Sequence, residues 1–168
     1  RQIEGAFSLV ITTNDSLVGV RDPQGFRPLC LGKTEHGYVL SSESCAFDAI
    51  KAEFIRDIDP GEMVIIDDRG VRSTIYAEPQ KIDKKLCVFE YIYFARSDSK
   101  IDGQSVYETR LNMGRELYNE TKYDADIVMS IPDSGTTAAL GYARASGIPF
   151  AEGLIKNRYS GRTFIKPR

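Results

Sequence analysis

The sequence predicts a mixed fold in two parts, an α+β first part built from antiparallel strands and an α/β second part. Three observations carry this prediction. Short strand patterns separated by turn residues fill residues 1 to about 85, a polar stretch at 81–86 interrupts them, and a strand–helix–strand pattern begins at Ile127. We therefore predict one domain at 1–85 and a second at 86–168.

The first part alternates strand and turn signals. A rigid loop rich in turn formers follows Val20, and Glu35-His36-Gly37 separates two apolar runs as the turn of a hairpin. Residues 42–48 predict a helical turn with a serine cap. The predicted strands are 6–12, 17–20, 29–31, 38–40, 55–58, 63–66 and 71–76.

Residues 63–74 allow two interpretations. An apolar strand that ends in Asp67 and Asp68 superficially resembles a pyrophosphate–sugar binding motif. In such a motif a glycine–threonine loop and a helix follow the acids, whereas residues 71–76 alternate and are β-branched. We therefore predict a β-hairpin with its turn at Asp68-Arg69-Gly70.

The second part predicts helix over 105–119, an apolar strand at 126–131, a polar turn at 132–137, helix over 138–145 and a new extended segment at 148–150. The turn carries three hydroxyl side chains, Ser134, Thr136 and Thr137. A strand that leads through such a turn into a helix N-terminus is typical of anion sites in α/β proteins. Simple capping of the helix by one of these hydroxyls is the alternative.

A cationic loop follows, with no acidic residue after Glu152; its basic residues are Lys156, Arg158, Arg162, Lys166 and Arg168. Arg158 and Arg162 are each suited to bidentate contact with a phosphate. The interleaved Tyr159, Gly161 and Phe164 suit a loop that closes over a ligand, although a solvated tail is the alternative. Together the turn and the loop predict a site for a phosphorylated small molecule.

Composition excludes other classes. The chain has 168 residues and a net charge of -2, so we expect no nucleic acid as partner, and no apolar run is long enough to cross a membrane. Three widely spaced cysteines without a CxxC pair indicate reduced thiols in a cytoplasmic protein rather than a zinc site. We expect no catalytic role for His36, the single histidine.

Eight blocks of the sequence carry a resemblance to a known family. They are 5–7 (GAF), 21–23 (RDP), 27–29 (RPL), 41–48 (SSESCAFD), 59–63 (DPGEM), 89–96 (FEYIYFAR), 131–134 (IPDS) and 156–165 (KNRYSGRTFI), of which the last is the most specific. With these blocks the chain resembles the glutamine phosphoribosylpyrophosphate amidotransferase (amidophosphoribosyltransferase) family over nearly its whole length.

The resemblance implies the rear part of an N-terminal-nucleophile hydrolase sandwich, followed by the start of a type I phosphoribosyltransferase parallel-sheet domain. It implies transfer of glutamine-derived ammonia to phosphoribosyl pyrophosphate with Mg2+, giving phosphoribosylamine, glutamate and pyrophosphate in the first committed step of de novo purine synthesis. It further implies feedback inhibition by purine nucleotides and a homotetramer or homodimer.

The resemblance also assigns site residues. Ser134 matches a serine near the family's magnesium site, and Cys87 matches the first ligand of a 4Fe-4S cluster that some members bind. The substrate-binding residues it implies are Lys156, Arg158, Tyr159 and Arg162. It implies no catalytic residue in this segment, because the family's nucleophile is an N-terminal cysteine at the front of the glutaminase domain, whereas this chain begins with Arg1 and resembles an internal segment. We therefore expect the 168-residue chain alone to be inactive; a non-catalytic nucleotide- or phosphate-binding regulatory module is the alternative.

Overall fold

The computed structural model describes residues 3–161, and the chain divides into two compact units, Arg1–Tyr107 (unit 1) and Glu108–Arg168 (unit 2). Residues 86–107 therefore pack with the strands of unit 1. The sequence places its domain boundary earlier, at 85/86. The predicted boundary stays a prediction, because a unit defined by its internal contacts need not end where one evolutionary domain meets the next.

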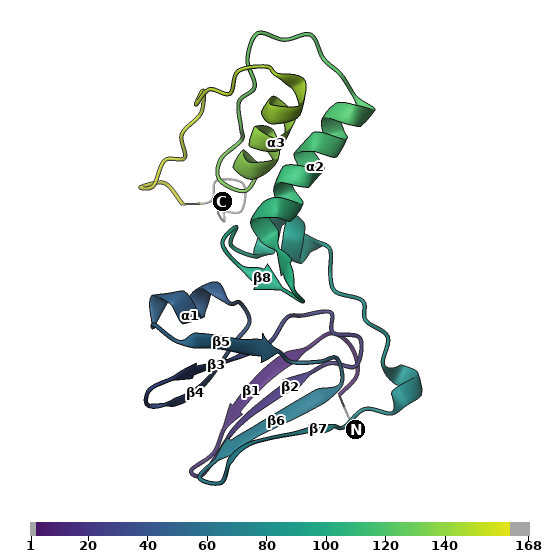
Figure 1. Cartoon of the computed structure of the whole chain (residues 1–168), viewed down its shortest axis with the longest axis vertical. Helices are drawn as coiled ribbons and strands as arrows, with labels where there is room; N and C mark the ends of the chain where they lie inside the picture. The colour runs from purple at the N-terminus through teal and green to yellow at the C-terminus, as the bar shows by residue number, and fades with distance from the viewer. Residues whose placement is uncertain (1–2, 162–168) are drawn as a thin grey trace, which may run out of the picture. The chain divides into compact units, whose positions relative to one another are not determined.

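Unit 1 contains a four-stranded antiparallel sheet in the order β1-β2-β6-β7 (Figure 1). Its strands are β1 (Ser8–Thr12), β2 (Leu17–Arg21), β6 (Glu62–Asp67) and β7 (Gly70–Ile75). Asp67 pairs with Gly70 across the turn between β6 and β7. The predicted hairpin is thus confirmed, and the resemblance of residues 63–74 to a pyrophosphate motif is only superficial.

A second antiparallel sheet has the order β4-β3-β5. It consists of β3 (Cys30–Thr34), β4 (Gly37–Ser41) and β5 (Glu53–Asp57), and the short helix α1 (Cys45–Ala49) lies between β4 and β5 in the chain. The β3–β4 hairpin closes where Thr34 pairs with Gly37, as the sequence predicts. The β-rich, antiparallel character predicted for the first part is therefore confirmed.

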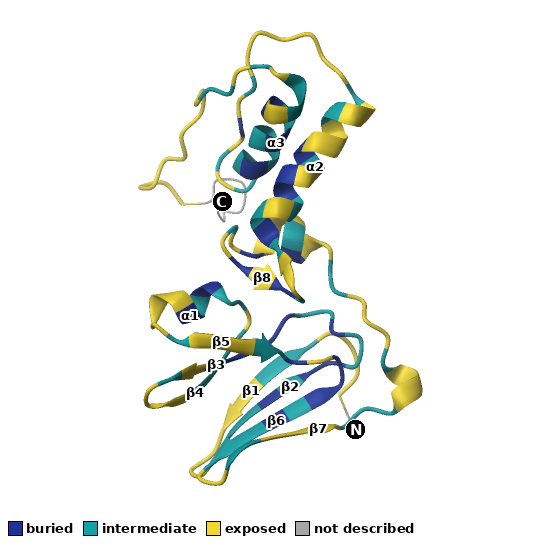
Figure 2. Cartoon of the chain, viewed as in Figure 1, coloured by how far each residue is buried: buried dark blue, intermediate teal, exposed yellow. Residues whose placement is uncertain are grey.

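Apolar side chains from both sheets meet in one core. Leu29, Ile58 and Val64 are buried together, and Leu40 packs against them. A Cβ atom on Gly19 of β2 would lie 2.8 Å from a methyl group of Leu40 on β4, so the two sheets approach closely at this point. Figure 2 shows the resulting dark, buried segments within β2 and β6.

The rest of unit 1 is a run of short elements: the 3-10 turn η1 (Pro79–Lys81), the π-helix η2 (Glu90–Phe94), and the two-stranded ribbon β8 (Lys100–Ile101) and β9 (Gln104–Ser105). A second core forms beneath them. Ala95, Ile101 and Val106 are buried, with Leu86 and Tyr91 packed against them. This core fixes the start of the next helix, because Val106 is its first residue.

Unit 2 contains the helices α2 (Val106–Glu120, which starts in unit 1) and α3 (Thr136–Ser146), close to their predicted bounds. The strand predicted at 126–131 and the extended segment predicted at 148–150 do pair in parallel, but neither is a regular strand. Within residues 3–161 they form a single parallel bridge, Val128 to Phe150, held by Val128 N–H to Pro149 O and Ala151 N–H to Val128 O, each 2.9 Å. A regular strand needs further hydrogen-bonded neighbours, which the described residues do not provide.

Glycines let α2 and α3 cross closely. A Cβ atom on Gly114 would lie 1.9 Å from the carbonyl oxygen of Ala138, and one on Gly141 would lie 2.1 Å from that of Leu111. No side chain fits at either distance, so backbone packs on backbone. Tyr118 and Tyr142 then meet edge to face, with ring centroids 5.5 Å apart.

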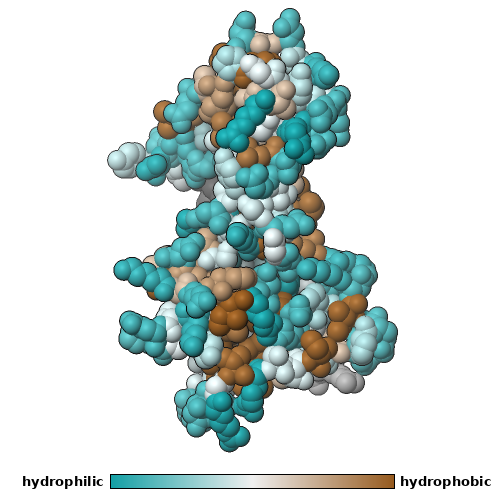
Figure 3. Space-filling model, in the orientation of Figure 1, coloured by the Kyte–Doolittle hydropathy of each residue, from teal (hydrophilic) through white to brown (hydrophobic). Residues whose placement is uncertain are grey.

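Apolar residues also remain on the surface of unit 1. Figure 3 shows brown, hydrophobic patches among the teal polar surface over the sheets. Exposed large hydrophobic residues occur on β1, β5 and β7, on η2 and at its N-cap, namely Val10, Ile11, Phe54, Ile55, Ile75, Phe89, Ile92, Tyr93 and Phe94. Among the described residues, no helix is both long and apolar enough to span a membrane.

Candidate functional site

A cavity of about 840 Å³ in unit 2 brings the polar turn and the basic loop together. The turn leaves the Val128 bridge and enters α3, and the loop leaves the Phe150 side of the same bridge. One hydrogen-bonded bridge therefore places two segments that lie about 25 residues apart in sequence beside one hollow. Its lining consists of Ser130, Pro132, Asp133, Thr136, Phe150, Glu152, Leu154, Ile155, Lys156, Asn157, Arg158, Ser160 and Gly161.

Hydroxyl groups form one wall. Ser130 is buried, and its Oγ lies 3.1 Å from Oγ1 of Thr136 in a hydrogen bond that joins the end of the bridge to the first residue of α3. Gly135 occupies the N-cap position of α3, and no side chain caps this helix. The capping alternative for the predicted hydroxyls is therefore wrong, and the Thr136 hydroxyl lies in the cavity wall instead.

Cationic side chains of the basic loop also line the cavity. Lys156 and Arg158 both line the cavity and are exposed. Lys156 Nζ lies 3.4 Å from Oδ2 of Asp133, which belongs to the polar turn. This ion pair joins the basic loop to the polar turn, and both partners are more than half exposed, so it is weak and easily exchanged for a stronger anion.

The predicted site residues fall in three groups. Lys156 and Arg158 line the cavity, while Ser134 is half-buried in the turn beside it and Tyr159 is fully exposed, and neither of these two is part of the lining. Arg162 lies outside the described residues. The roles proposed for these side chains stay predictions.

Sequence reasoning missed three residues of the lining. Ser130, Asp133 and Glu152 all contribute to the cavity. A usable signal existed for Ser130, because it ends the apolar run at which the polar turn begins, and polar groups at that end of a parallel pair face the ligand crevice. Glu152 gave no such signal, since its place depends on where the chain turns after Phe150.

The oxygen ligands available in this cavity suit a hard cation such as Mg2+. Ser130, Asp133 and Thr136 present hydroxyl and carboxylate oxygens to one cavity, and Mg2+ is commonly held by one or two such groups together with substrate phosphates. Within residues 3–161, no group of three or more His, Cys, Asp or Glu side chains is placed to hold a metal by itself. The residues thus fit a metal that arrives with a phosphorylated ligand.

An iron–sulfur cluster does not fit the described residues. Such a cluster takes four thiolates, and Cys30 and Cys45 are buried in the sheet region, where Cys30 donates a hydrogen bond to Ser41 O at 3.2 Å. Burial, with the nearby Asp57 carboxylate, raises the pKa of the Cys30 thiol to about 12, so it stays protonated. Cys87 would need partners from beyond residues 3–161.

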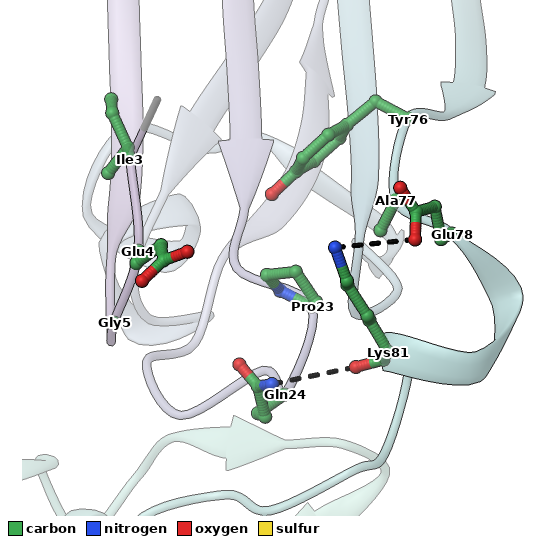
Figure 4. A pocket seen from close by; sticks show the side chains of 9 residues that line it. All are labelled: Ile3, Glu4, Gly5, Pro23, Gln24, Tyr76, Ala77, Glu78 and Lys81. Atoms are coloured by element: carbon green, nitrogen blue, oxygen red, sulfur yellow. Dashed lines mark hydrogen bonds and ion pairs between the residues drawn. The ribbon is translucent and has the colours of Figure 1, made fainter. Parts of the chain in front are cut away.

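Two other cavities lie in unit 1 and suit anions less. Figure 4 shows the smaller one, of about 310 Å³, between the segment at Glu4 and the turn from Tyr76 to Lys81. Its single cation, Lys81, already pairs with Glu78 at 3.3 Å, and Glu4 adds a second carboxylate. The excess of negative charge disfavours a phosphate here.

The larger cavity of unit 1, about 830 Å³, includes Arg27, Glu43 and Glu90. Arg27 Nη1 lies 2.7 Å from Glu90 Oε1, although the geometry is not that of a hydrogen bond. Burial raises the pKa of Glu90, Arg27 opposes the shift and Glu43 adds to it. With two carboxylates and one guanidinium, this cavity also disfavours a phosphate, and the cavity lined by Lys156 and Arg158 suits one better.

The chain is similar to curated amidophosphoribosyltransferases. It is 52% identical to the protein of Archaeoglobus fulgidus over 163 residues, which cover 97% of this chain and 35% of that protein. It is 55% identical to the protein of Synechococcus elongatus over 172 residues, which cover 99% and 34%. The chain thus spans about a third of the length of these relatives. No protein-family model matches it.

Solved structures agree with the curated relatives. The fold superposes with a TM-score of 0.90 and 47% identity on glutamine phosphoribosylpyrophosphate amidotransferase from B. subtilis complexed with ADP and GMP, over 98% of this chain and 36% of that one. A second structure, of an allosteric regulatory enzyme of purine biosynthesis, gives the same TM-score and identity, over 98% and 35%. The resemblance stated from the sequence is confirmed, as is the mixed α/β fold.

Proposed function

We propose that this chain, which is homologous to amidophosphoribosyltransferases over nearly all of its length, forms part of such an enzyme. The longer protein would be a glycosyltransferase that moves ammonia from glutamine to phosphoribosyl pyrophosphate, with phosphoribosylamine, glutamate and pyrophosphate as products. The observation that carries the proposal is the cavity in which a hydroxyl-bearing turn faces Lys156 and Arg158. It is the kind of site that a sugar bearing phosphate and pyrophosphate groups requires.

The finer division of the fold belongs to the same proposal. Residues 1–85 would be the rear of an N-terminal-nucleophile glutaminase, which fits their two antiparallel sheets. Residues 86–168 would open a type I phosphoribosyltransferase domain, which fits a turn that runs from a parallel bridge into a helix. Exposed apolar residues on the sheets, such as Val10 and Phe54, are then surfaces that further chain covers.

The described side chains suggest how the substrate is held. The pyrophosphate would take the place of Asp133 beside Lys156, because a group of higher charge outcompetes one exposed carboxylate. The Ser130 and Thr136 hydroxyls share one hydrogen bond, so one of the two would donate its remaining proton to the same oxygens. Mg2+ would supply charge neutralisation between phosphates, with Ser134 close by, and Tyr159 and Arg162 would close the loop over the ligand.

Regulation and assembly are part of the proposal as well. A related structure is described with ADP and GMP, which supports purine nucleotides as feedback inhibitors. We propose a homo-oligomer, a tetramer or a dimer. A non-catalytic nucleotide- or phosphate-binding module stays the second candidate, since the same cationic wall would accept a nucleotide phosphate.

Titration calorimetry on a polypeptide extended to the full length of its relatives tests the proposal. We expect phosphoribosyl pyrophosphate to bind with Mg2+, and Lys156→Ala to weaken it about tenfold, because one charge-assisted contact is lost. Lys122→Ala, which removes an exposed lysine outside the cavity, is the matched control and should leave the affinity unchanged.

Two results would count against the proposal. Tight binding of AMP or GMP without any binding of phosphoribosyl pyrophosphate would favour the regulatory module. Release of glutamate from glutamine by the 168-residue chain alone would contradict the proposed lack of a complete glutaminase centre in this segment.

A further inference from the structure

One buried arginine in unit 1 uses its whole guanidinium group. Arg21, the last residue of β2, is 1% exposed. Its Nε and Nη atoms donate to the carbonyl oxygens of Arg27 (3.0 Å), Ile58 (2.7 Å) and Gly25 (3.1 Å). The two Nη atoms also donate to the two carboxylate oxygens of Asp102, at 3.0 and 3.1 Å. All five N–H groups are thereby satisfied, which only the fork of an arginine allows.

Asp102 lies far along the chain, at the tip of the turn between β8 and β9. The turn needs positive φ at both of its central residues, 48° at Asp102 and 79° at Gly103. Other groups hold the same turn in place: Tyr91 donates its hydroxyl to Ile101 O at 2.8 Å, and Lys84 Nζ lies 3.4 Å from Asp102. The strained conformation at Asp102 is thus maintained by contacts from outside the turn.

A second set of contacts holds the loop just before β8. Glu43, in the turn after β4, accepts hydrogen bonds from Arg96 N–H (2.8 Å) and Ser99 Oγ (2.7 Å). Ser44, at the N-cap of α1, does not cap its helix and instead accepts the N–H of Lys100 at 2.8 Å. Two sets of hydrogen bonds therefore hold residues 96–102 against the sheet region, one from Arg21 and one from Glu43 and Ser44.

The electrostatic environment fits a paired, ionised Asp102. Burial alone would raise its pKa, but the hydrogen bonds and charge of Arg21, with Lys84, outweigh burial and lower it. Asp57, at the end of β5, behaves differently: burial and the Asp102 charge raise its pKa, although it accepts the N–H of Gly103. Arg21, with Lys84 beside it, thus supplies the positive charge that stabilises Asp102 in this turn, and Arg21 also opposes the rise in the pKa of Asp57.

We infer that Arg21 is a positioning residue that joins the two predicted domains through Asp102 and thereby sets where α2 begins. Arg21 lies in the predicted glutaminase part and Asp102 beyond the predicted boundary at 85/86, and both are in unit 1. From Asp102 the chain reaches Val106, the first residue of α2, which is fully buried and donates to Ser99 O at 3.0 Å. The inference rests on the proposed function, since coupling matters only if ammonia passes between two half-reactions.

The test compares two nitrogen donors in a polypeptide extended to the full length of its relatives. Asp102→Asn leaves Arg21 without its carboxylate, and we expect glutamine-dependent synthesis of phosphoribosylamine to fall about tenfold more than ammonia-dependent synthesis. Arg21→Lys keeps the charge but not the fork, and should uncouple the two rates in the same direction.

The control is Glu62→Gln. Glu62 forms a comparable fork with Arg56, at 2.8 and 2.6 Å, but this pair does not touch residues 96–106 in the contacts described. It should change both rates in parallel. Equal losses with the two donors in Asp102→Asn and Arg21→Lys, or the same uncoupling in Glu62→Gln, would overturn the inference.

A failure of the proposed function can be distinguished from a failure of the inference about Arg21. If the unmodified protein makes no phosphoribosylamine from either donor, the activity is wrong, and hydrogen exchange then decides the positioning role. We expect the Val106 amide to exchange at least about tenfold faster in Asp102→Asn and at an unchanged rate in Glu62→Gln. Unchanged protection of Val106 in Asp102→Asn would refute the inference.

Discussion

The two units are stabilised in different ways. Unit 1 combines two apolar cores with buried ion pairs whose hydrogen bonds are satisfied, as at Arg21 and Glu62. Unit 2 depends on two helices whose backbones touch at Gly114 and Gly141, and its candidate site is lined mostly by exposed side chains, although Ser130 is buried. The difference indicates that buried contacts hold the backbone of unit 1 in one conformation. The exposed side chains at the site of unit 2 keep the conformational freedom that ligand exchange requires.

The largest effect is expected when the central ion pair of unit 1, between Arg21 and Asp102, is removed. Arg21→Met should lower the free energy of unfolding by about 3–5 kcal/mol, because it leaves Asp102 and three carbonyl oxygens buried without their partner. Urea denaturation of the 168-residue chain measures the loss. Arg69→Met, at an exposed turn position, should change stability by less than about 0.5 kcal/mol. A loss at Arg21 as small as at Arg69 would mean that unit 1 does not depend on buried charge.

Local chemistry explains which parts of the fold the sequence predicts. The hairpins at Gly37 and Gly70 were predictable because turn residues and β-branched alternation occur within a few positions. Ser44 shows where prediction fails: its type and position indicate a helix cap, yet its hydroxyl accepts the N–H of Lys100, which lies 56 positions away. Long-range competition of this kind leaves no local pattern.

The candidate site, too, is only partly predictable from the sequence. Lys156 and Arg158 stand out because a cationic loop without acids is visible in the sequence. The pairing of Lys156 with Asp133 and the bond between Ser130 and Thr136 depend on a single bridge at Val128, which local periodicity predicts as a full strand. Predicting these contacts would require the tertiary arrangement itself.

A smaller effect is expected when the close contact between the two helices of unit 2 is disturbed. Gly114→Ala should destabilise unit 2 by about 1–3 kcal/mol, because the new methyl group would lie 1.9 Å from Ala138 O and the helices must separate. Hydrogen exchange at the amides of α3 should quicken while those of β6 keep their protection. Gly161→Ala is the matched control, since an added Cβ atom there meets nothing within 4 Å. Equal exchange in both variants would show that close helix crossing does not hold unit 2 together.

The smallest predicted effect is a dependence of stability on pH, which we expect in unit 1 but not at the site of unit 2. Burial alone would raise the pKa of Glu62, but hydrogen bonds from Arg56 and the Asp59 N–H outweigh it, so the pKa is lowered. The stability from this carboxylate is then present above its ordinary pKa, near 4.5, and is lost as the pH falls through the lowered value. Its size is about 1 kcal/mol, because Arg56 is 37% exposed and water screens the pair.

Glu62→Gln should therefore be less stable than the unmodified chain at pH 7, and the difference should shrink on acidification below about pH 4. Lys156→Ala should leave stability unchanged within about 0.5 kcal/mol at either pH, because both partners of its ion pair are more than half exposed. Denaturation curves at pH 7 and pH 3.5 measure both variants. A gap for Glu62→Gln that widens at low pH would contradict the role assigned to buried charge in unit 1, and a clear loss in Lys156→Ala would make the site a structural element rather than an open binding surface.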